Sequence, residues 1–278
     1  MNVLSLFDGM SCGMIALDRL GIKVDNYYAS EIDKYAMQVS AANYPEIIQV
    51  GDITKLDLST LPKIDLVMGG SPCQDLSFAN SKGQGLAGKR SSLFFEFHKA
   101  ISYLQPKYFL LENVRMKKEN LDVISQYMGV QPIMINSDRF VCQNRVRFYW
   151  TNIAVNVLPK RPKWNKKYYQ WRRTHFRENK SGVCPTLTAN MGTGGHNVPL
   201  YSKNLQDKLS VVELERLQAV PDNYTNHVSN TQRYKMLGNG WTIEVIAHIL
   251  KNMELNNSQA DAMANQRGNP QQQGEQNA

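Results

Sequence analysis

One short stretch constrains the fold more than any other: an apolar run followed at once by a turn that carries a cysteine. The run Lys63–Met68 predicts a buried strand. The two glycines and the proline of Gly69–Gln74 predict that a tight turn ends this strand. In open α/β sheets, ligands bind outside the carboxyl ends of the strands. Cys73 is therefore placed for chemistry, although an isolated cysteine is more often a buried packing residue.

Apolar runs and helical patterns alternate through the N-terminal half of the chain. The helical patterns are Met14–Leu20, closed by Gly21, then Leu93–Leu104 and Leu121–Met128. The alternation predicts an α/β fold with a doubly wound, mainly parallel sheet. The predicted strands are Asn2–Phe7, Tyr27–Ser30, Ile47–Val50, Lys63–Met68, Tyr108–Leu111, Gln131–Asn136 and Arg145–Asn152.

Polar groups stand where several of these strands begin or end. Glu112 ends one strand, and Arg145 and Arg147 enter another. The turn Gly9–Gly13 leads from a strand into a helix, whose free N-terminal amides can meet polar ligand groups. Glu31, after the second strand, is placed to bind ribose hydroxyls, or it is an ordinary surface acid. These positions predict a nucleotide-type site at one edge of the sheet.

Six stretches, in this order along the chain, resemble the cytosine-5 DNA methyltransferase family. The resemblance implies a class I S-adenosylmethionine-dependent methyltransferase fold with a small target-recognition domain. The C-terminal third, especially Val211–Leu250, resembles the eukaryotic de novo DNA methyltransferases more than it resembles long bacterial modification enzymes. Ser71 and Gly240-Trp241 depart from the usual residues of the family, and neither removes a catalytic group. The stretches are Phe7–Gly13, Gly69–Gln74, Glu112–Val114, Gln143–Arg147, Pro185–Thr188 and Gly238–Gly240.

The resemblance implies a catalytic role for four residues. Cys73 would add to carbon 6 of a cytosine flipped out of double-stranded DNA, because a thiolate is a strong nucleophile. Glu112 would act at N3 as a protonated acid. Arg145 would hold O2 of the base, and Arg147 would support the pocket or the loop.

The resemblance also implies S-adenosyl-L-methionine as the cofactor. Phe7 would lie against the adenine, Glu31 would bind the ribose, and Asp52 would bind the adenine amino group. Cys12 replaces a small residue in the cofactor turn and need not be reactive. The implied cofactor-binding residues are Phe7, Asp8, Gly9, Ser11, Cys12, Gly13, Glu31, Ile32, Asp52, Ile53, Leu93, Asn239 and Trp241.

The positive charge is concentrated in one segment. The net charge is +8, and Lys160–Lys180 holds nine Lys or Arg against one acid, which accounts for the whole excess. The segment predicts a polyanion partner, with a solvated basic face as the alternative. Its interleaved aromatic residues either stack on bases or form the core of a small domain. The predicted DNA contacts are Lys82, Lys89 and Arg90 in the Gly-rich loop Asp75–Ser92, and Lys166, Lys167, Arg172 and Arg173.

Four regions are predicted along the chain. Residues 1–155 form the catalytic, cofactor-binding domain, and 156–233 form the target-recognition domain. Residues 234–255 form a C-terminal helix that returns to the catalytic domain. Residues 256–278, rich in Asn and Gln, are expected to be disordered.

The remaining composition excludes several classes of protein. The 4 cysteines are widely spaced and the histidines show no ligand spacing, so we expect no metal site and a reducing compartment. There is no predicted membrane span or secretory signal. We therefore expect a cytoplasmic protein, and the resemblance implies that it acts on DNA as a monomer. Two alternatives are a transfer RNA cytosine-5 methyltransferase, whose Cys-Phe-Thr element is absent here, and an inactive DNA-binding regulator.

Overall fold

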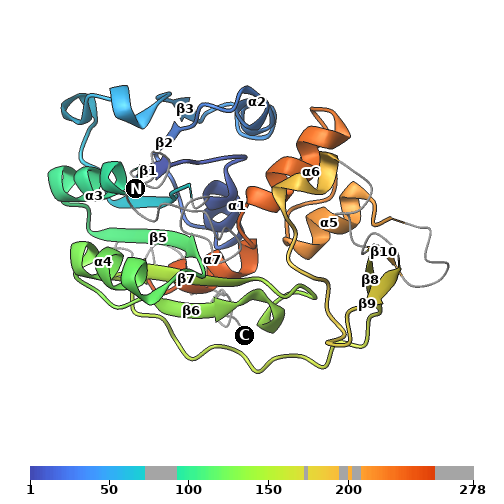
Figure 1. Cartoon of the computed structure of the whole chain (residues 1–278). Helices are drawn as coiled ribbons and strands as arrows, with labels where there is room; N and C mark the ends of the chain where they lie inside the picture. The colour runs from blue at the N-terminus through green and yellow to red at the C-terminus, as the bar shows by residue number, and fades with distance from the viewer. Residues whose placement is uncertain (73–92, 172–174, 194–199, 202–207, 254–278) are drawn as a thin grey trace, which may run out of the picture.

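The computed structural model describes residues 1–72, 93–171, 175–193, 200–201 and 208–253 (Figure 1). Several predictions fall outside these ranges. They concern the loop 75–92, the tail 256–278, and the residues Cys73, Lys82, Lys89, Arg90, Arg172 and Arg173.

The core of the fold is a sheet with the strand order β3-β2-β1-β4-β5-β7-β6. Neighbouring strands are parallel except at β7, which runs antiparallel to both β5 and β6. The predicted mainly parallel sheet is confirmed. Its strands are β1 (Asn2–Leu6), β2 (Asn26–Ser30), β3 (Ile48–Gln49), β4 (Leu66–Gly70), β5 (Tyr108–Val114), β6 (Ile133–Asn136) and β7 (Val146–Thr151).

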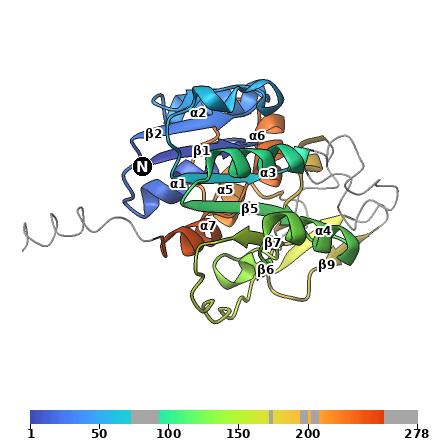
Figure 2. The same ribbon diagram turned by 90° about the vertical axis from the view of Figure 1, so that its left-hand side faces the viewer.

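Helices cover both faces of this sheet (Figures 1 and 2). Side chains alternate along each strand: Leu66 and Met68 join one buried cluster, whereas Val67 between them joins the other. The first cluster packs under α1 (Cys12–Arg19), α2 (Lys34–Asn43) and α7 (Ile243–Leu250). The second packs under α3 (Leu93–Leu104) and α4 (Lys118–Met128). Burial on both faces explains the nearly continuous apolar runs of the strands.

The structure corrects the predicted end of β4. Gly69 and Gly70 do not form a turn; they are the last two residues of the strand and pair with Leu111 and Glu112 of β5. A Cβ on Gly69 would lie 2.6 Å from the carbonyl oxygen of Leu6. The glycines therefore allow close approach within the sheet, which the sequence signal for a turn does not distinguish.

The C-terminal part adds a small antiparallel sheet, on the right in Figure 1, and three helices. Ser210 and Glu213 form a capping box at the start of α5. Tyr168 of β8 and Leu214 of α5 belong to the same buried cluster as side chains of α1 and α7. The division at residues 156 and 233 stays a prediction. The elements are β8 (Tyr168–Trp171), β9 (Phe176–Glu178), β10 (Leu200–Tyr201), α5 (Val211–Leu217), α6 (Asn230–Asn239) and α7.

The strand order reverses between β1 and β4, which places a crevice at their carboxyl ends. No helix in the described part of the chain is long and apolar enough to cross a membrane. Short 3₁₀ turns connect the main elements at Ile53–Lys55, Leu58–Thr60, Ser137–Arg139 and Ala189–Thr193.

Candidate functional site

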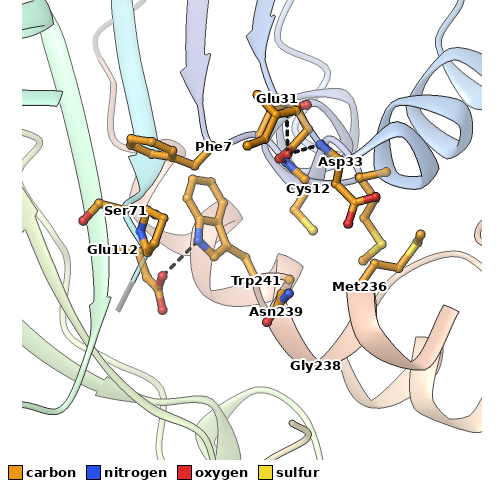
Figure 3. Close-up of a pocket in the computed structure, with 18 of the residues that line it drawn as sticks. Phe7, Cys12, Glu31, Asp33, Ser71, Glu112, Met236, Gly238, Asn239 and Trp241 are labelled. Atoms are coloured by element: carbon orange, nitrogen blue, oxygen red, sulfur yellow. Dashed lines mark hydrogen bonds between the residues drawn. The ribbon is translucent and has the colours of Figure 1, made fainter. Parts of the chain in front are cut away.

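A cavity of about 430 Å³ lies at this reversal point (Figure 3). Its walls come from the carboxyl ends of β1, β2, β4 and β5, and from the turn between α6 and α7. Fourteen of the predicted site residues line the cavity. They are Phe7, Asp8, Gly9, Cys12, Glu31, Ile32, Asp52, Ile53, Leu93, Glu112, Arg145, Arg147, Asn239 and Trp241.

Two predicted cofactor residues lie behind the wall of the cavity. The Ser11 hydroxyl is fully buried, at 2.5 Å from the Asp8 carboxylate and 2.5 Å from the Ser40 hydroxyl. A Cβ on Gly13 would lie 2.3 Å from the methyl carbon of Met68. Ser11 lies in the turn between β1 and α1, Gly13 lies in the first turn of α1, and neither is among the lining residues.

Glu31 is held as a fixed acceptor at the end of β2 (Figure 3). Its Oε2 accepts the Gly9 amide at 2.7 Å, and its Oε1 accepts the amides of Ile32 at 2.7 Å and Asp33 at 2.8 Å. Ile32 beside it is 76% exposed. A ligand with both hydroxyl groups and a flat ring would suit this arrangement. Its hydroxyl groups could donate to the fixed carboxylate, and its ring could pack against the exposed apolar side chain.

Buried polar groups support the floor of the cavity. The Asp8 carboxylate accepts hydrogen bonds from Tyr27 Oη at 2.7 Å and from Ser11 Oγ. Burial nevertheless raises the pKa of Asp8 to about 6. Burial also raises the pKa of the Cys12 thiol to about 12, so this cysteine is a thiol and a poor nucleophile.

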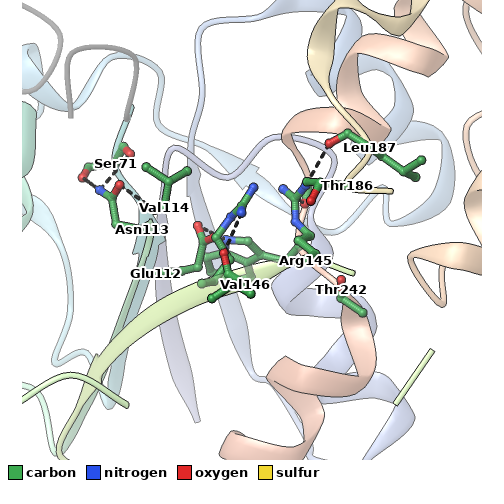
Figure 4. A network of polar contacts seen from close by, with 12 residues as sticks. Ser71, Glu112, Asn113, Val114, Arg145, Val146, Thr186, Leu187 and Thr242 are labelled. Carbon is green, nitrogen blue, oxygen red and sulfur yellow. Dashed lines mark hydrogen bonds and ion pairs between the residues drawn. The ribbon is translucent and has the colours of Figure 1, made fainter. Parts of the chain in front are cut away.

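Glu112 of β5 is held from two sides. Its Oε1 forms an ion pair with Nε of Arg147 on β7 at 2.8 Å (Figure 4). Its Oε2 accepts the indole N–H of Trp241 at 3.2 Å (Figure 3). The Glu112 side chain is 10% exposed and that of Arg147 is 13% exposed. This buried, fixed carboxylate lines the same cavity as Glu31.

Arg145 has a different environment from Arg147. Its guanidinium donates to the carbonyl oxygens of Leu187 at 3.1 Å, Gly238 at 3.2 Å and Gly240 at 2.9 Å. The residue is 4% exposed. The contact of Arg145 with a base stays a prediction that this geometry does not favour, because its donors hold the carbonyls of Leu187 and of the α6–α7 turn. Arg147, beside Glu112, is better placed for that contact.

The end of β4 leads toward Cys73, which lies outside the described residues. Asn113 of β5 donates to the Ser71 hydroxyl at 3.0 Å and to the Ser71 carbonyl at 3.3 Å. Ser71 and Pro72 line the cavity next to Glu112. The last described residues before Cys73 therefore belong to the same cavity.

Sequence reasoning missed the contribution of α6. Gln232, Lys235 and Met236 line the cavity from this helix, and Lys235 Nζ forms an ion pair with Asp33 at 2.7 Å. Ser229 at the N-cap is the signal that could have located the helix. The apolar stripe of α6 is weak because its buried positions include Arg233 and Gly238.

The basic segment is partly described. Lys166 and Lys167 are exposed, as a DNA contact requires. Two aromatic residues pack instead: Tyr168 is buried, and half-buried Trp164 donates its indole N–H to the Asp138 carbonyl at 2.6 Å. These two support the packing alternative for the aromatic residues. Among the residues the structure describes, no group of His, Cys, Asp and Glu could hold a metal ion.

Comparison with known proteins identifies the family. A sequence model described as C-5 cytosine-specific DNA methylase matches residues 1–170 and 143–255. The chain is 27% identical over 310 residues to the type II methyltransferase M.Bsp6I of Bacillus sp. strain RFL6, covering 91% of this chain and 98% of that protein. It is 28% identical over 304 residues to the type II methyltransferase M.NlaX of Neisseria lactamica, covering 91% and 96%.

A solved structure shows the same fold. The Dnmt2 methyltransferase of S. pombe superposes with a TM-score of 0.68 at 18% identity, covering 90% of this chain and 97% of that chain. The family match extends over the strands and turns that build the cavity and over the C-terminal helices. The chain belongs to the C-5 cytosine-specific DNA methylase family.

Proposed function

We propose that this protein transfers a methyl group from S-adenosyl-L-methionine to carbon 5 of cytosine in double-stranded DNA, within the cavity described above. The observation that carries the proposal is the placement of Glu112, paired with Arg147, in one cavity with the amide-bound carboxylate of Glu31. Family membership supports the reaction class. We expect the protein to act as a monomer on DNA in the cytoplasm.

The half of the cavity around Glu31 fits the methyl donor. Glu31 would bind the ribose hydroxyls, because three amides fix its carboxylate as an acceptor. Ile32 and Phe7 offer apolar surface for the adenine, and Asp52 and Asn239 supply polar groups on the same cavity. When bound, S-adenosyl-L-methionine supplies an electrophilic methyl group.

The half of the cavity around Glu112 suits a flipped cytosine. A duplex hides carbon 5, so the base must leave the stack to reach the cavity. Cys73 would add to carbon 6 and make carbon 5 nucleophilic. Glu112, carrying a proton, would stabilise the ring through N3, and Arg147 would stabilise charge at O2. After carbon 5 has accepted the methyl group, loss of its proton would expel Cys73 as a thiolate and restore the ring. Arg145 would position the turn at Gly238–Gly240.

Bisulfite sequencing of plasmid DNA from expressing cells tests this function. We expect methylated cytosines at one recognition sequence with the wild-type protein and none with Cys73→Ser, because only the nucleophile is lost. Calorimetry should show equal cofactor binding by both proteins. Methylation by the Cys73→Ser variant would contradict the covalent mechanism. Unmethylated DNA with a folded, cofactor-binding wild type would favour the transfer RNA enzyme or the inactive regulator.

A further inference from the structure

Trp241 connects the two halves of the cavity. Its indole N–H donates to Oε2 of Glu112 at 3.2 Å, and its ring lines the cavity that also contains Phe7 and Glu31 (Figure 3). The residue is 9% exposed. The Trp241 ring borders the half of the cavity around Glu31, and its N–H donates into the half around Glu112. This side chain can therefore influence both halves.

The backbone around Trp241 is anchored on both sides. The carbonyl of Gly240 accepts from Arg145 at 2.9 Å and from Gln218 at 3.3 Å. The hydroxyl of Thr242 donates to Gln218 Oε1 at 2.7 Å. All three bonds are largely buried, so the indole has little freedom to leave Glu112.

Gly70 leaves the space that this contact needs. A Cβ on Gly70 would lie 2.9 Å from Oε2 of Glu112 and 2.9 Å from the indole nitrogen of Trp241. The hydrogen bond therefore forms directly over the end of β4, beside the backbone that leads to Pro72.

The Glu112 carboxylate is fixed by one donor on each oxygen. Arg147 holds Oε1, and Trp241 holds Oε2. A carboxylate oxygen has two lone pairs, so each oxygen keeps one that can hold the proton offered to N3 of the base. With Arg147 alone, the carboxylate could rotate about the remaining contact, and its second oxygen would lose its direction.

We propose that Trp241 is a positioning residue for methyl transfer, acting through its indole N–H on Glu112. This inference rests on the proposed function. The hydrogen bond orients Glu112 toward the base, while the ring forms part of the wall that faces the methyl donor. Trp241 thereby couples the placement of the acid to the shape of the cofactor subsite.

Two replacements separate the N–H from the ring. Trp241→Phe keeps an aromatic ring, and β-(3-benzothienyl)alanine at position 241 keeps the indole shape with sulfur in place of N–H. We expect both to slow single-turnover methyl transfer roughly tenfold or more, because Glu112 loses the donor that directs its second oxygen. The benzothienyl protein should bind the cofactor as the wild type does. A wild-type rate with benzothienylalanine would overturn the proposal.

The hydrogen bond itself can be observed without activity. In the ¹⁵N-indole spectrum, the Trp241 signal is the one that disappears in Trp241→Phe. Glu112→Ala should shift this signal and leave that of Trp150, whose N–H donates to the Ser125 hydroxyl at 2.9 Å. An unmoved Trp241 signal would contradict the inference. A wild type that methylates no DNA but shows the shift would instead refute the proposed function.

Discussion

At the scale of single residues, two arginines separated by one position, at the start of β7, have separate tasks. Arg145 donates to three backbone carbonyls, whereas Arg147 pairs with a carboxylate in the cavity. The sequence places both at the start of a strand and does not tell them apart. The difference arises from the α6–α7 turn, which lies 93 and 95 positions away along the chain.

Lysine substitutions should separate these tasks. Arg145→Lys keeps the charge but cannot reach three carbonyls, so we expect a loss of about 2 kcal/mol in the free energy of unfolding. Arg147→Lys can keep an ion pair with Glu112, so its loss should stay below about 1 kcal/mol while methyl transfer slows. Denaturant unfolding and single-turnover assays measure the two effects. Equal losses of unfolding free energy in both variants would show that the carbonyl contacts of Arg145 stabilise the fold no more than the ion pair of Arg147 does.

Asp8 gives the folded state a pH dependence. Burial raises its pKa from the usual 3.8 to about 6, beside Tyr27 and Glu31. The folded state therefore binds this proton more tightly than the unfolded chain. The stabilisation is complete below the unfolded pKa and disappears as the pH rises through about 6.

Asp8→Asn should remove this dependence. Relative to the variant, the wild type should lose about 3 kcal/mol of unfolding free energy between roughly pH 4 and pH 7. The Tyr27 and Ser11 hydroxyls can reorient toward an amide, so the variant should fold. Denaturant unfolding at several pH values gives the difference. A gap between the two proteins that stays constant with pH would contradict the raised pKa.

At the scale of elements, the sequence predicts those strands and helices whose apolar residues follow one clear periodicity. Apolar runs located the strands of the sheet, and helical patterns located α1, α3 and α4. Two features escaped because their signals point elsewhere. Gly69 and Gly70 look like a turn, but Gly69 allows close approach between strands and Gly70 leaves room for the contact between Glu112 and Trp241. The helix α6 buries Arg233 and carries a glycine near its end, so its pattern is weak.

That glycine, Gly238, gives an element-scale prediction. Replacing a helical glycine by alanine usually stabilises a helix by about 1 kcal/mol. Here a Cβ would lie 2.1 Å from the Thr188 carbonyl carbon and 2.3 Å from the Ala189 nitrogen. These are backbone atoms and cannot rotate away. We therefore expect Gly238→Ala to destabilise the protein by about 3 kcal/mol, measured by denaturant unfolding.

Gly21→Ala is the matched control. Gly21 has a φ of 66° and nothing lies within 4 Å of an added Cβ, so only backbone strain of about 1 kcal/mol should appear. If Gly238→Ala were as stable as the wild type, α6 would have room to move away from Thr188 and Ala189.

At the scale of the whole molecule, the sequence predicted more of the residues that line the cavity than of the surface expected to contact DNA. Fourteen predicted residues line one cavity, and those at the ends of β1, β2 and β5 meet there because the carboxyl ends of parallel strands share one edge of the sheet. The hydrogen bond between Trp241 and Glu112 joins positions 129 residues apart and has no local sequence signal. The DNA surface is harder still, since charge alone does not say which basic side chains meet phosphates.

The basic segment makes the last prediction. Lys163, Lys166 and Lys167 are exposed in the stretch that holds the excess positive charge. If they meet phosphates, replacing all three by Gln should reduce the slope of log affinity against log salt concentration by about 2 to 3. Cofactor affinity should not change, because none of the three lines the cavity.

The opposite edge of the sheet supplies a control with the same change of charge. Exposed Lys23, Lys63 and Lys107 precede β2, β4 and β5, at the amino ends of parallel strands and away from the cavity. Their replacement by Gln should alter the slope by less than about 0.5, since long-range attraction is screened at moderate salt. Fluorescence titrations of both triple variants at several salt concentrations decide the matter. Equal slopes in the two variants would place the phosphate contacts outside Lys163–Lys167.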